Sequence, residues 1–313
     1  MSDKVIIETR DLVKSYGKFV AVDRLNLSIT EGQVFGFLGP NGAGKTTTLL
    51  MLLGLTEPTS GTATICGYDS IREPVEIKRL AGYLPEKVGF YEDLTAAENL
   101  DYTAALNGLS RKISVKKIDD LLNIVGLSDM ANKKVRTFSH GMKQRLGIAD
   151  VMIKDPKVAF FDEPTAGIDP EGIEQVLGLI ANMARRKVTI VLSSHQLHHV
   201  QKVCTRVGIL SKGRLVAEGS VDELGREKIA GGKVRIEIQV AEPSRKLVKL
   251  VEKIKGVTGV ESTGNVLLIS CEKDLRRQIA KVAADCDSLI VQMKIEEYGL
   301  DEIYMKYFSE RQI

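Results

Sequence analysis

One stretch of this sequence has residue types and spacing that suit the binding of a triphosphate: GPNGAGKT, residues 39–46. Its three glycines allow backbone conformations that point successive N–H groups inward and let them approach phosphate oxygens closely. In such a loop the lysine, here Lys45, reaches the β and γ phosphates, and the hydroxyl of the following Thr46 ligates Mg²⁺. Residues 39–46, called the phosphate loop below, therefore predict a nucleotide site. The residues expected to contact the nucleotide are Gly39, Pro40, Asn41, Gly42, Ala43, Gly44, Lys45, Thr46 and Thr47.

The stretch VAFFDE, residues 158–163, places two adjacent acids at the end of an apolar run. Such a run is typical of a buried strand in a parallel sheet. Asp162 is the expected holder of the metal ion, and Glu163 is a candidate general base for a water molecule. Two acids are also found where a strand simply meets solvent, but together with the phosphate loop they predict a nucleoside triphosphatase.

The helix start in TFSHGMKQRLGIAD, residues 137–150, lacks an acid where one is favoured. Ser139 is a good N-cap, yet Lys143 and Arg145 follow it near a terminus where the helix dipole favours Asp or Glu. A capping box would place Glu or Gln three residues after the serine, and Met142 stands there instead. The pattern predicts a helix N-terminus that receives an anion from elsewhere. Lys143 and Arg145 either belong to that anion site or are ordinary solvated side chains.

Alternation and apolar runs predict the elements that position these residues. Half-buried strands are expected at 4–9 and 18–29, with a turn at SYG between them. The next expected elements are the strand GQVFGFLG, the helix KTTTLLMLLGL, the hairpin TSGTATICGYD and the strand LAGYLPE. Helices follow over residues 93–154, with breaks at Gly108, Gly126 and Ser139. The last expected elements are the parallel strands KVAFFDEP and KVTIVLSSH, which flank a helix that starts near Asp169, and the hairpin RVGILSKGRLVAEGS.

A domain boundary is expected near residue 230, where AGGK interrupts the pattern. Residues 1–230 then form the nucleotide-binding domain, and residues 231–313 form a smaller α+β domain. The expected order of elements in the smaller domain is a split β-α-β-β-α-β unit. Its expected elements are strand 233–240, helix 243–254, strands 257–262 and 265–271, helix 272–284, strand 289–296 and helix 299–308.

Composition restricts the class of protein. The 313 residues are 43% hydrophobic and 27% charged with a net charge of +3, which is ordinary for a soluble globular protein and too balanced for electrostatic capture of nucleic acid or of an anionic bilayer. The longest apolar run, LLMLLGL, is far shorter than the roughly 18 residues that cross a membrane, and the N-terminus lacks the order of a signal peptide. The four cysteines lie far apart, and we interpret them as free thiols of the cytosol.

The ordered set GPNGAGKT, YLPE, FSHGMKQR, VAFFDEP, AGID and SSH resembles the ATP-binding cassette of ABC transporters over about residues 4–225. The resemblance implies an α/β fold of the P-loop NTPase class. It implies a RecA-like core, an N-terminal antiparallel β-subdomain and a helical subdomain over about residues 87–155. The cofactors that it implies are ATP and Mg²⁺.

The same resemblance implies roles for residues outside the phosphate loop. Tyr16 would stack on adenine, which suits an aromatic side chain, although an exposed tyrosine in a turn is also common without any ligand. Glu163 would activate the attacking water, His195 would contact the γ-phosphate, and Asp169 would bridge to a second subunit. Lys45 would act with them in catalysis.

The resemblance also implies a ligand for the N-terminus of the helix that Ser139 caps. In the family the corresponding N-terminus points at the γ-phosphate of ATP held by the other subunit, so Ser139 and Gly141 would act in trans. The missing acid of this helix is then explained, because the counter-charge arrives with the ligand. The resemblance implies a homodimer, or a paired cassette, with ATP at its interface.

Two positions depart from the family's usual pattern. Glu86 follows YLP where the family commonly has Gln, which touches Mg²⁺ and water; a carboxylate also ligates Mg²⁺ but adds negative charge beside a triphosphate. The segment from Phe138 to Met142 keeps only the serine and the second glycine of the usual Leu-Ser-Gly-Gly-Gln. These are the two residues that would reach phosphate. Both departures resemble an exporter branch of drug and polysaccharide type.

Two biological roles remain open at this point. The first is the ATPase of an exporter. Its permease would be a separate integral-membrane chain that docks on residues 87–137. This chain would then lie on the cytoplasmic face of the cell membrane. The alternative is a soluble cassette ATPase acting on DNA or ribosomes. That class usually carries two cassettes, and the tail beyond residue 232 has 14 basic and 13 acidic residues, which gives no basic footprint for nucleic acid. We therefore expect no nucleic-acid partner. The tail is expected to be a packing or dimer surface, or a small-ligand regulatory domain.

Overall fold

The computed structural model describes residues 4–228, 234–242, 244–295, 303–305 and 307. It divides into two compact units, Met1–Glu218 and Gly219–Ile313, and each unit is described by itself. The sequence places the domain boundary near residue 230 instead. The two positions are separated by one helix, α8 (Val221–Lys228), which the sequence reading did not include. The assignment of 1–230 and 231–313 as domains stays a prediction.

A six-stranded sheet forms the centre of the first unit. Its strand order is β10-β9-β3-β8-β7-β6, and the pairs from β9 to β6 are parallel. Every residue of β3, β7 and β8 is buried, as is typical of a parallel sheet that is covered on both faces. The strands are β3 (Val34–Leu38), β6 (Ala81–Leu84), β7 (Val158–Asp162), β8 (Thr189–Ser194), β9 (Arg206–Ser211) and β10 (Arg214–Gly219).

An antiparallel sheet of order β2-β1-β4-β5 forms a second layer of this unit. Its strands are β1 (Val5–Tyr16), β2 (Phe19–Thr30), β4 (Ser60–Ile65) and β5 (Tyr68–Asp69). The sequence predicted that the first strand ends at residue 9, which is wrong. The strand continues through a register shift between Thr9 and Leu12, where Asp11 adopts a φ of 44°, and it stops only at the turn after Tyr16. A bulge of this kind interrupts the alternation that the sequence pattern relies on.

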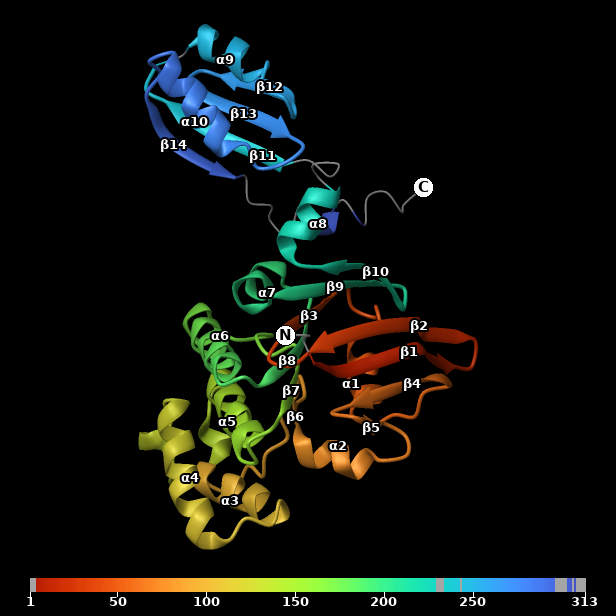
Figure 1. Ribbon diagram of the computed structural model, residues 1–313. Helices are drawn as coiled ribbons and strands as arrows, with labels where there is room; N and C mark the ends of the chain where they lie inside the picture. Colours follow the sequence, from red (N-terminus) through yellow and green to blue (C-terminus); the bar gives the residue numbers. More distant parts are fainter. Residues whose placement is uncertain (1–3, 229–233, 243, 296–302, 306, 308–313) are drawn as a thin grey trace. The chain divides into compact units, whose positions relative to one another are not determined.

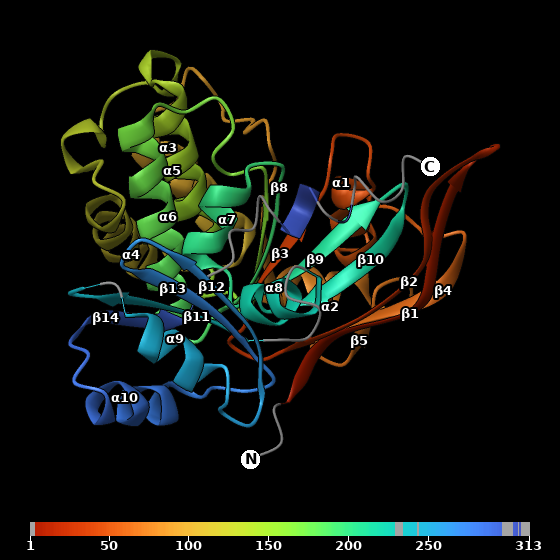
Figure 2. The same cartoon turned by 90° about the horizontal axis from the view of Figure 1, so that it is seen from above.

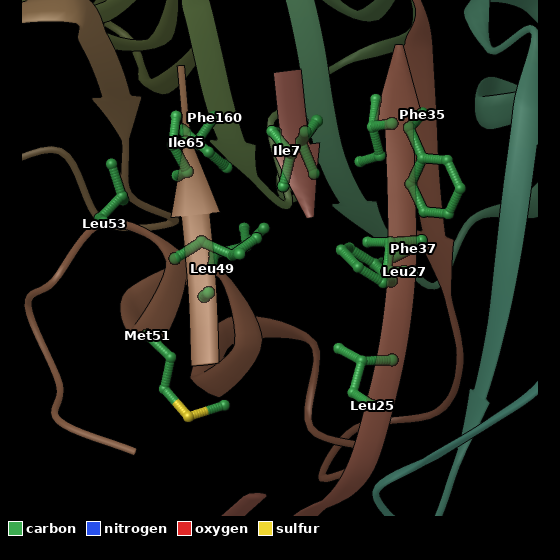
Figure 3. Packing of buried hydrophobic residues seen from close by; sticks show 14 of the residues in the cluster. Ile7, Leu25, Leu27, Phe35, Phe37, Leu49, Met51, Leu53, Ile65 and Phe160 are labelled. Carbon is green, nitrogen blue, oxygen red and sulfur yellow. The ribbon is translucent and has the colours of Figure 1, made fainter. Parts of the chain in front are cut away.

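Helix α1 (Lys45–Leu52) lies between the two sheets (Figure 2), and helices α6 (Pro170–Arg185) and α7 (Leu197–Val203) pack on the other side of the central sheet. The core between the sheets is apolar (Figure 3). It includes Ile7, Leu25, Leu27, Phe35, Phe37, Leu49, Met51, Ile65 and Phe160. This packing holds the N-terminus of α1 and the ends of β3 and β7 at one edge of the sheet, where the chemistry is expected.

A helical insert follows β6, as the sequence predicts (Figure 1). Its helices are α3 (Ala96–Leu106), α4 (Arg111–Ile124) and α5 (His140–Met152), with short 3₁₀ turns between α4 and α5. Helix α3 begins with a capping box in which Thr95 and Glu98 bind each other's backbone N–H groups. Helix α2 (Pro74–Leu80), which connects β5 to β6, was not predicted.

The second unit contains the expected split β-α-β-β-α-β arrangement. Its antiparallel sheet has the order β12-β13-β11-β14, and its core is made of apolar residues from the sheet and from two helices. The elements are β11 (Val234–Val240), α9 (Arg245–Val251), β12 (Val257–Thr263), β13 (Val266–Cys271), α10 (Arg276–Asp285) and β14 (Ile290–Ile295). Most of the helix expected at 299–308 lies outside the described residues.

Candidate nucleotide site

The phosphate loop joins β3 to α1 with the backbone geometry that its glycines predict. Gly42 and Gly44 have φ values of 80° and 102° in the left-handed region. At Gly44 a Cβ atom would lie 2.4 Å from the carbonyl oxygen of Ala21, so only glycine fits against β2. Helix α1 begins at Lys45, and its described first turn has neither an acidic residue nor a side-chain cap. Its N-terminal N–H groups are therefore available to an anion.

The side chain of Lys45 lies across this loop and is almost fully buried. Its Nζ donates to the carbonyl oxygens of Gly39 at 2.8 Å and Pro40 at 3.3 Å. The same Nζ lies 3.3 Å from Oε1 of Glu163. The structure thus brings the lysine and the expected general base together, although they are far apart in the sequence.

Asp162 ends β7 beside the first residues of α1. Its Oδ1 accepts hydrogen bonds from the hydroxyl of Thr46 at 3.1 Å and from the hydroxyl of Ser193. A hydroxyl and a carboxylate at this separation are hard oxygen ligands of the kind that Mg²⁺ prefers. The same Ser193 hydroxyl accepts from the backbone N–H of Glu163 at 3.1 Å, so Ser193 holds both acids. The sequence reading missed Ser193, although a serine at the end of an apolar strand is a recognisable signal.

Glu163 is buried and has a φ of 47°, a left-handed conformation that costs a non-glycine residue on the order of 1–3 kcal/mol. The backbone N–H of Glu163 is held by Ser193, and its Oε2 lies 2.9 Å from Nδ1 of His195. The His195 ring is half-exposed, whereas the carboxylate is not. The strained backbone and the histidine contact together aim the Glu163 carboxylate toward the phosphate loop, the place where a general base is expected.

A cavity of about 320 Å³ opens over the phosphate loop. Besides loop residues, it is lined by Glu163, Glu86 and two aromatic side chains, Tyr16 and Phe19. Tyr16 is 54% exposed and Phe19 is 61% exposed, so both rings are accessible to a ligand. Phe19 was not predicted, yet it is the next aromatic residue after the turn that follows Tyr16. The structure therefore gathers a phosphate cradle, two acids and an aromatic wall in one cavity.

As the structure describes it, the lining of this cavity lacks seven of the predicted residues: Gly39, Pro40, Asp162, His195, Ser139, Gly141 and Asp169. The last three lie at the start of α5 and in the loop beside it. Ser139 caps α5, accepting from the N–H of Met142 at 3.3 Å, and the described first turn of α5 has no acidic side chain. A Cβ atom at Gly141 would lie 3.1 Å from Ile168, so α5 starts directly against the loop that leads to Asp169. Ser139, Gly141 and Asp169 are absent from the lining of the cavity among the residues that the structure describes.

Lys143 and Arg145 have partners inside the helical insert. The Nζ of Lys143 lies 2.8 Å from Oε1 of Glu92. The guanidinium of Arg145 donates to the carbonyl oxygens of Val125 and Gly126 just beyond the end of α4, at 2.8 and 3.1 Å. These contacts fasten α5 to the rest of the insert, which is a third role beside the two that the sequence left open.

Comparisons with known proteins agree with this geometry. The family described as ABC transporter matches residues 22–166. The bacitracin transport ATP-binding protein BcrA of Bacillus licheniformis is 43% identical over 244 residues, which cover 78% of this chain and 78% of that protein. This chain belongs to the family of ABC transporter ATP-binding proteins. The linearmycin resistance ATP-binding protein LnrL of Bacillus subtilis is 30% identical over 96% of this ABC chain and 97% of its own length. A solved ATP-binding subunit of an ABC transporter has a TM-score of 0.65 and 31% identity, covering 71% of this chain and 92% of that one.

Membership in the ABC family confirms the predicted fold class and the predicted activity. The chain is an ATPase that binds and hydrolyses ATP as the nucleotide-binding subunit of an ABC transporter. The cradle of the phosphate loop fits the nucleotide, because N–H groups, a lysine and close glycine packing converge there. None of the helices in the described parts of the chain has the length and apolar character needed to cross a membrane.

Proposed function

We propose that this ABC ATPase works as a head-to-tail pair, in which ATP in the phosphate loop of one copy is covered by the N-terminus of α5 from the other. The observation that carries the proposal is the start of α5. It is capped by Ser139 and has no acid in its described first turn, and its first residues do not line the chain's own cavity. A helix N-terminus of this kind favours an anion. The triphosphate of a partner copy supplies one.

In this arrangement Glu163 accepts a proton from the attacking water, and His195 holds the carboxylate in position through the contact at Nδ1. Lys45 binds the β and γ phosphates, and the N–H groups from Gly39 to Thr47 bind the phosphate oxygens. Tyr16 and Phe19 stack on or beside the adenine, since both are exposed aromatic side chains of the cavity. Ser139 and Gly141 contact the γ-phosphate held by the partner, and Asp169 approaches the partner's surface.

We also propose that Mg²⁺ is bound by Thr46, Asp162 and Glu86. The Thr46 hydroxyl and the Asp162 carboxylate lie within hydrogen-bonding distance of each other, and Glu86 lines the cavity together with Thr46. When bound, the ion would neutralise charge on the phosphate oxygens. The Ser193 hydroxyl keeps Asp162 turned toward Thr46. Glu86 supplies a carboxylate where most of the family has an amide, and we expect it to act as a ligand through water.

The permease, a separate integral-membrane chain, would dock on the helical insert. A second cavity of about 260 Å³ lies there between the end of β6 and helices α3 and α5. Its lining includes Tyr83, Phe90, Tyr91 and Tyr102, and aromatic residues of this kind are enriched in protein interfaces. Burial raises the pKa of the Asp150 carboxyl at the wall of this cavity. Burial, together with the negative charge of Asp162, raises the pKa of the Tyr83 hydroxyl to about 12.

We propose export as the direction of transport and the cytoplasmic face of the cell membrane as the location. One relative, similar over 78% of this chain, is named for bacitracin transport, and another, similar over 96%, is named for linearmycin resistance; these names support the proposal. The transported compound is selected by the permease. Identification of the integral-membrane chain that co-purifies with this protein from its native membrane tests this part; recovery with ribosomes or DNA would contradict it.

The paired site is tested by size-exclusion chromatography of the Glu163→Gln variant with and without ATP. This variant should retain ATP and accumulate as a dimer, because hydrolysis no longer separates the two copies. Ser139→Arg in the same background places a bulky cation where the partner's phosphate is expected. It should bind ATP as a monomer without dimerising. A monomeric Glu163→Gln protein at saturating ATP would contradict the proposal.

A further inference from the structure

His140 is the first residue of α5, at a position where the family's usual sequence has glycine. Its Nε2 lies 2.9 Å from the carbonyl oxygen of Ala166. A carbonyl oxygen only accepts hydrogen bonds, so Nε2 carries the proton and donates. The contact therefore joins the start of α5 to the loop 163–169, which runs from the general base to the N-cap of α6.

The loop 163–169 also packs against the ring of this histidine. Gly167 has a φ of 69°, and its α-carbon faces the imidazole closely enough that a Cβ atom would lie 3.6 Å from the ring. Next along the loop, Ile168 packs against Gly141. The first two residues of α5 thus both contact this loop: His140 through a hydrogen bond to Ala166, and Gly141 through close packing with Ile168.

The same loop is closed on its other side at Glu163. The N–H of Ala166 donates to the carbonyl oxygen of Glu163 at 3.1 Å, and Glu163 keeps its left-handed backbone. A continuous path of covalent and hydrogen-bonded contacts therefore leads from Ser139 and Gly141 through His140 and Ala166 to Glu163. In the proposed pair, the first end of the path would face the ATP of the partner copy, and the last end would face the chain's own ATP.

We propose that His140 is a positioning residue that couples the two ATP sites of the pair. Closure of α5 on the partner's triphosphate orients the Glu163 carboxylate of the same chain through the His140–Ala166 hydrogen bond. Coupling of this kind acts on turnover, so closure over one ATP changes the rate of hydrolysis at the other site. This inference rests on the proposed head-to-tail pair.

The test compares His140→Gln with His140→Asn. The amide nitrogen of glutamine reaches about as far as Nε2 of histidine and can donate to Ala166, whereas that of asparagine is one methylene shorter and cannot. Both are uncharged amides at the same helix position, so they form a matched pair. His140→Ala removes the donor altogether.

We expect the Asn and Ala variants to lower kcat about three- to tenfold, which is the usual worth of one hydrogen bond. The Hill coefficient for ATP should fall to about one, and the apparent KM should stay within about twofold, because the ATP contacts are unchanged. The Gln variant should keep the kcat and the cooperativity of the parent. In the Glu163→Gln background, the His140 variants should still dimerise with ATP.

Equal behaviour of the Gln and Asn variants would overturn the inference, and so would parental kcat and cooperativity in His140→Ala. Loss of the ATP-dependent dimer in His140→Ala, as expected of Ser139→Arg, would also overturn it, since His140 would then act on the partner's phosphate. Failure of the underlying pair is a separate result. It would already be visible as a monomeric Glu163→Gln protein whose His140 is intact.

Discussion

The ammonium group of Lys45 lies 3.3 Å from the carboxylate of Glu163, and both side chains are at least nine-tenths buried. One of these residues is expected to bind phosphate and the other to accept a proton from water. A triphosphate in the loop competes with Glu163 for the same ammonium group. Binding of ATP is therefore expected to release the carboxylate toward the attacking water, while His195 keeps it in place.

The Lys45→Ala variant is expected to bind ATP about 10- to 100-fold more weakly, because charge-assisted hydrogen bonds to the phosphates are lost. Anisotropy of a fluorescent ATP analogue measures this change. Lys112→Ala, an exposed lysine at the start of α4, is the control and should bind as the parent does. Unchanged affinity in Lys45→Ala would remove this residue from the phosphate site.

Glu163→Gln is expected to lower turnover about 10²- to 10⁴-fold, which is the usual contribution of a general base. ATP binding should be kept or improved, because a negative charge beside the triphosphate is removed. Phosphate release under saturating ATP measures the first effect, and titration with the labelled analogue measures the second. Turnover within threefold of the parent would exclude Glu163 as the base.

Ser193→Ala tests the hydroxyl that holds both acids of the site. The change removes one hydrogen bond from Asp162 and leaves the N–H of the strained Glu163 only its bond to the carbonyl oxygen of residue 193 at 3.2 Å. We expect a loss of about 1–3 kcal/mol in the free energy of unfolding, measured with urea, and a drop of about tenfold in kcat. Ser60→Ala, at the exposed start of β4, makes the same chemical change away from the site and should leave kcat close to that of the parent. Equal effects of the two changes would contradict the role of Ser193.

Tyr16→Ala and Phe19→Ala test the aromatic wall of the cavity. Both side chains are exposed, so stability should change by no more than about 0.5 kcal/mol. Each stacking contact with a base is worth about 1–3 kcal/mol, so ATP should bind more weakly to a variant whose ring stacks on adenine. Isothermal titration with tripolyphosphate is the control, since a ligand without adenine should bind equally well. A parallel loss for both ligands would place the defect in the phosphate loop instead.

The phosphate loop, the two acids at the end of β7 and the cap of α5 could be predicted from the sequence because each depends on neighbouring residues. Glycine conformation, a buried apolar run and an N-cap are properties of a few consecutive residues. The same holds for the two adjacent strands in KVAFFDEP and KVTIVLSSH, because their runs of apolar residues predict that they are buried. The extension of β1 beyond Thr9 was not predicted, since a bulge depends on pairing with β2 and β4.

The tertiary structure alone decided which of these residues meet. The Lys45–Glu163 pair and the Thr46–Asp162 contact arise from the packing of two sheets around α1, which also places Tyr16 and Phe19 over the phosphate loop. The partners of Lys143 and Arg145 were decided in the same way. Each of these contacts joins residues that are distant in the sequence. The distance between their atoms depends on the register of the strands and on the packing of the helices. Local residue types identified the chemistry of this protein, and long-range packing placed it in one cavity.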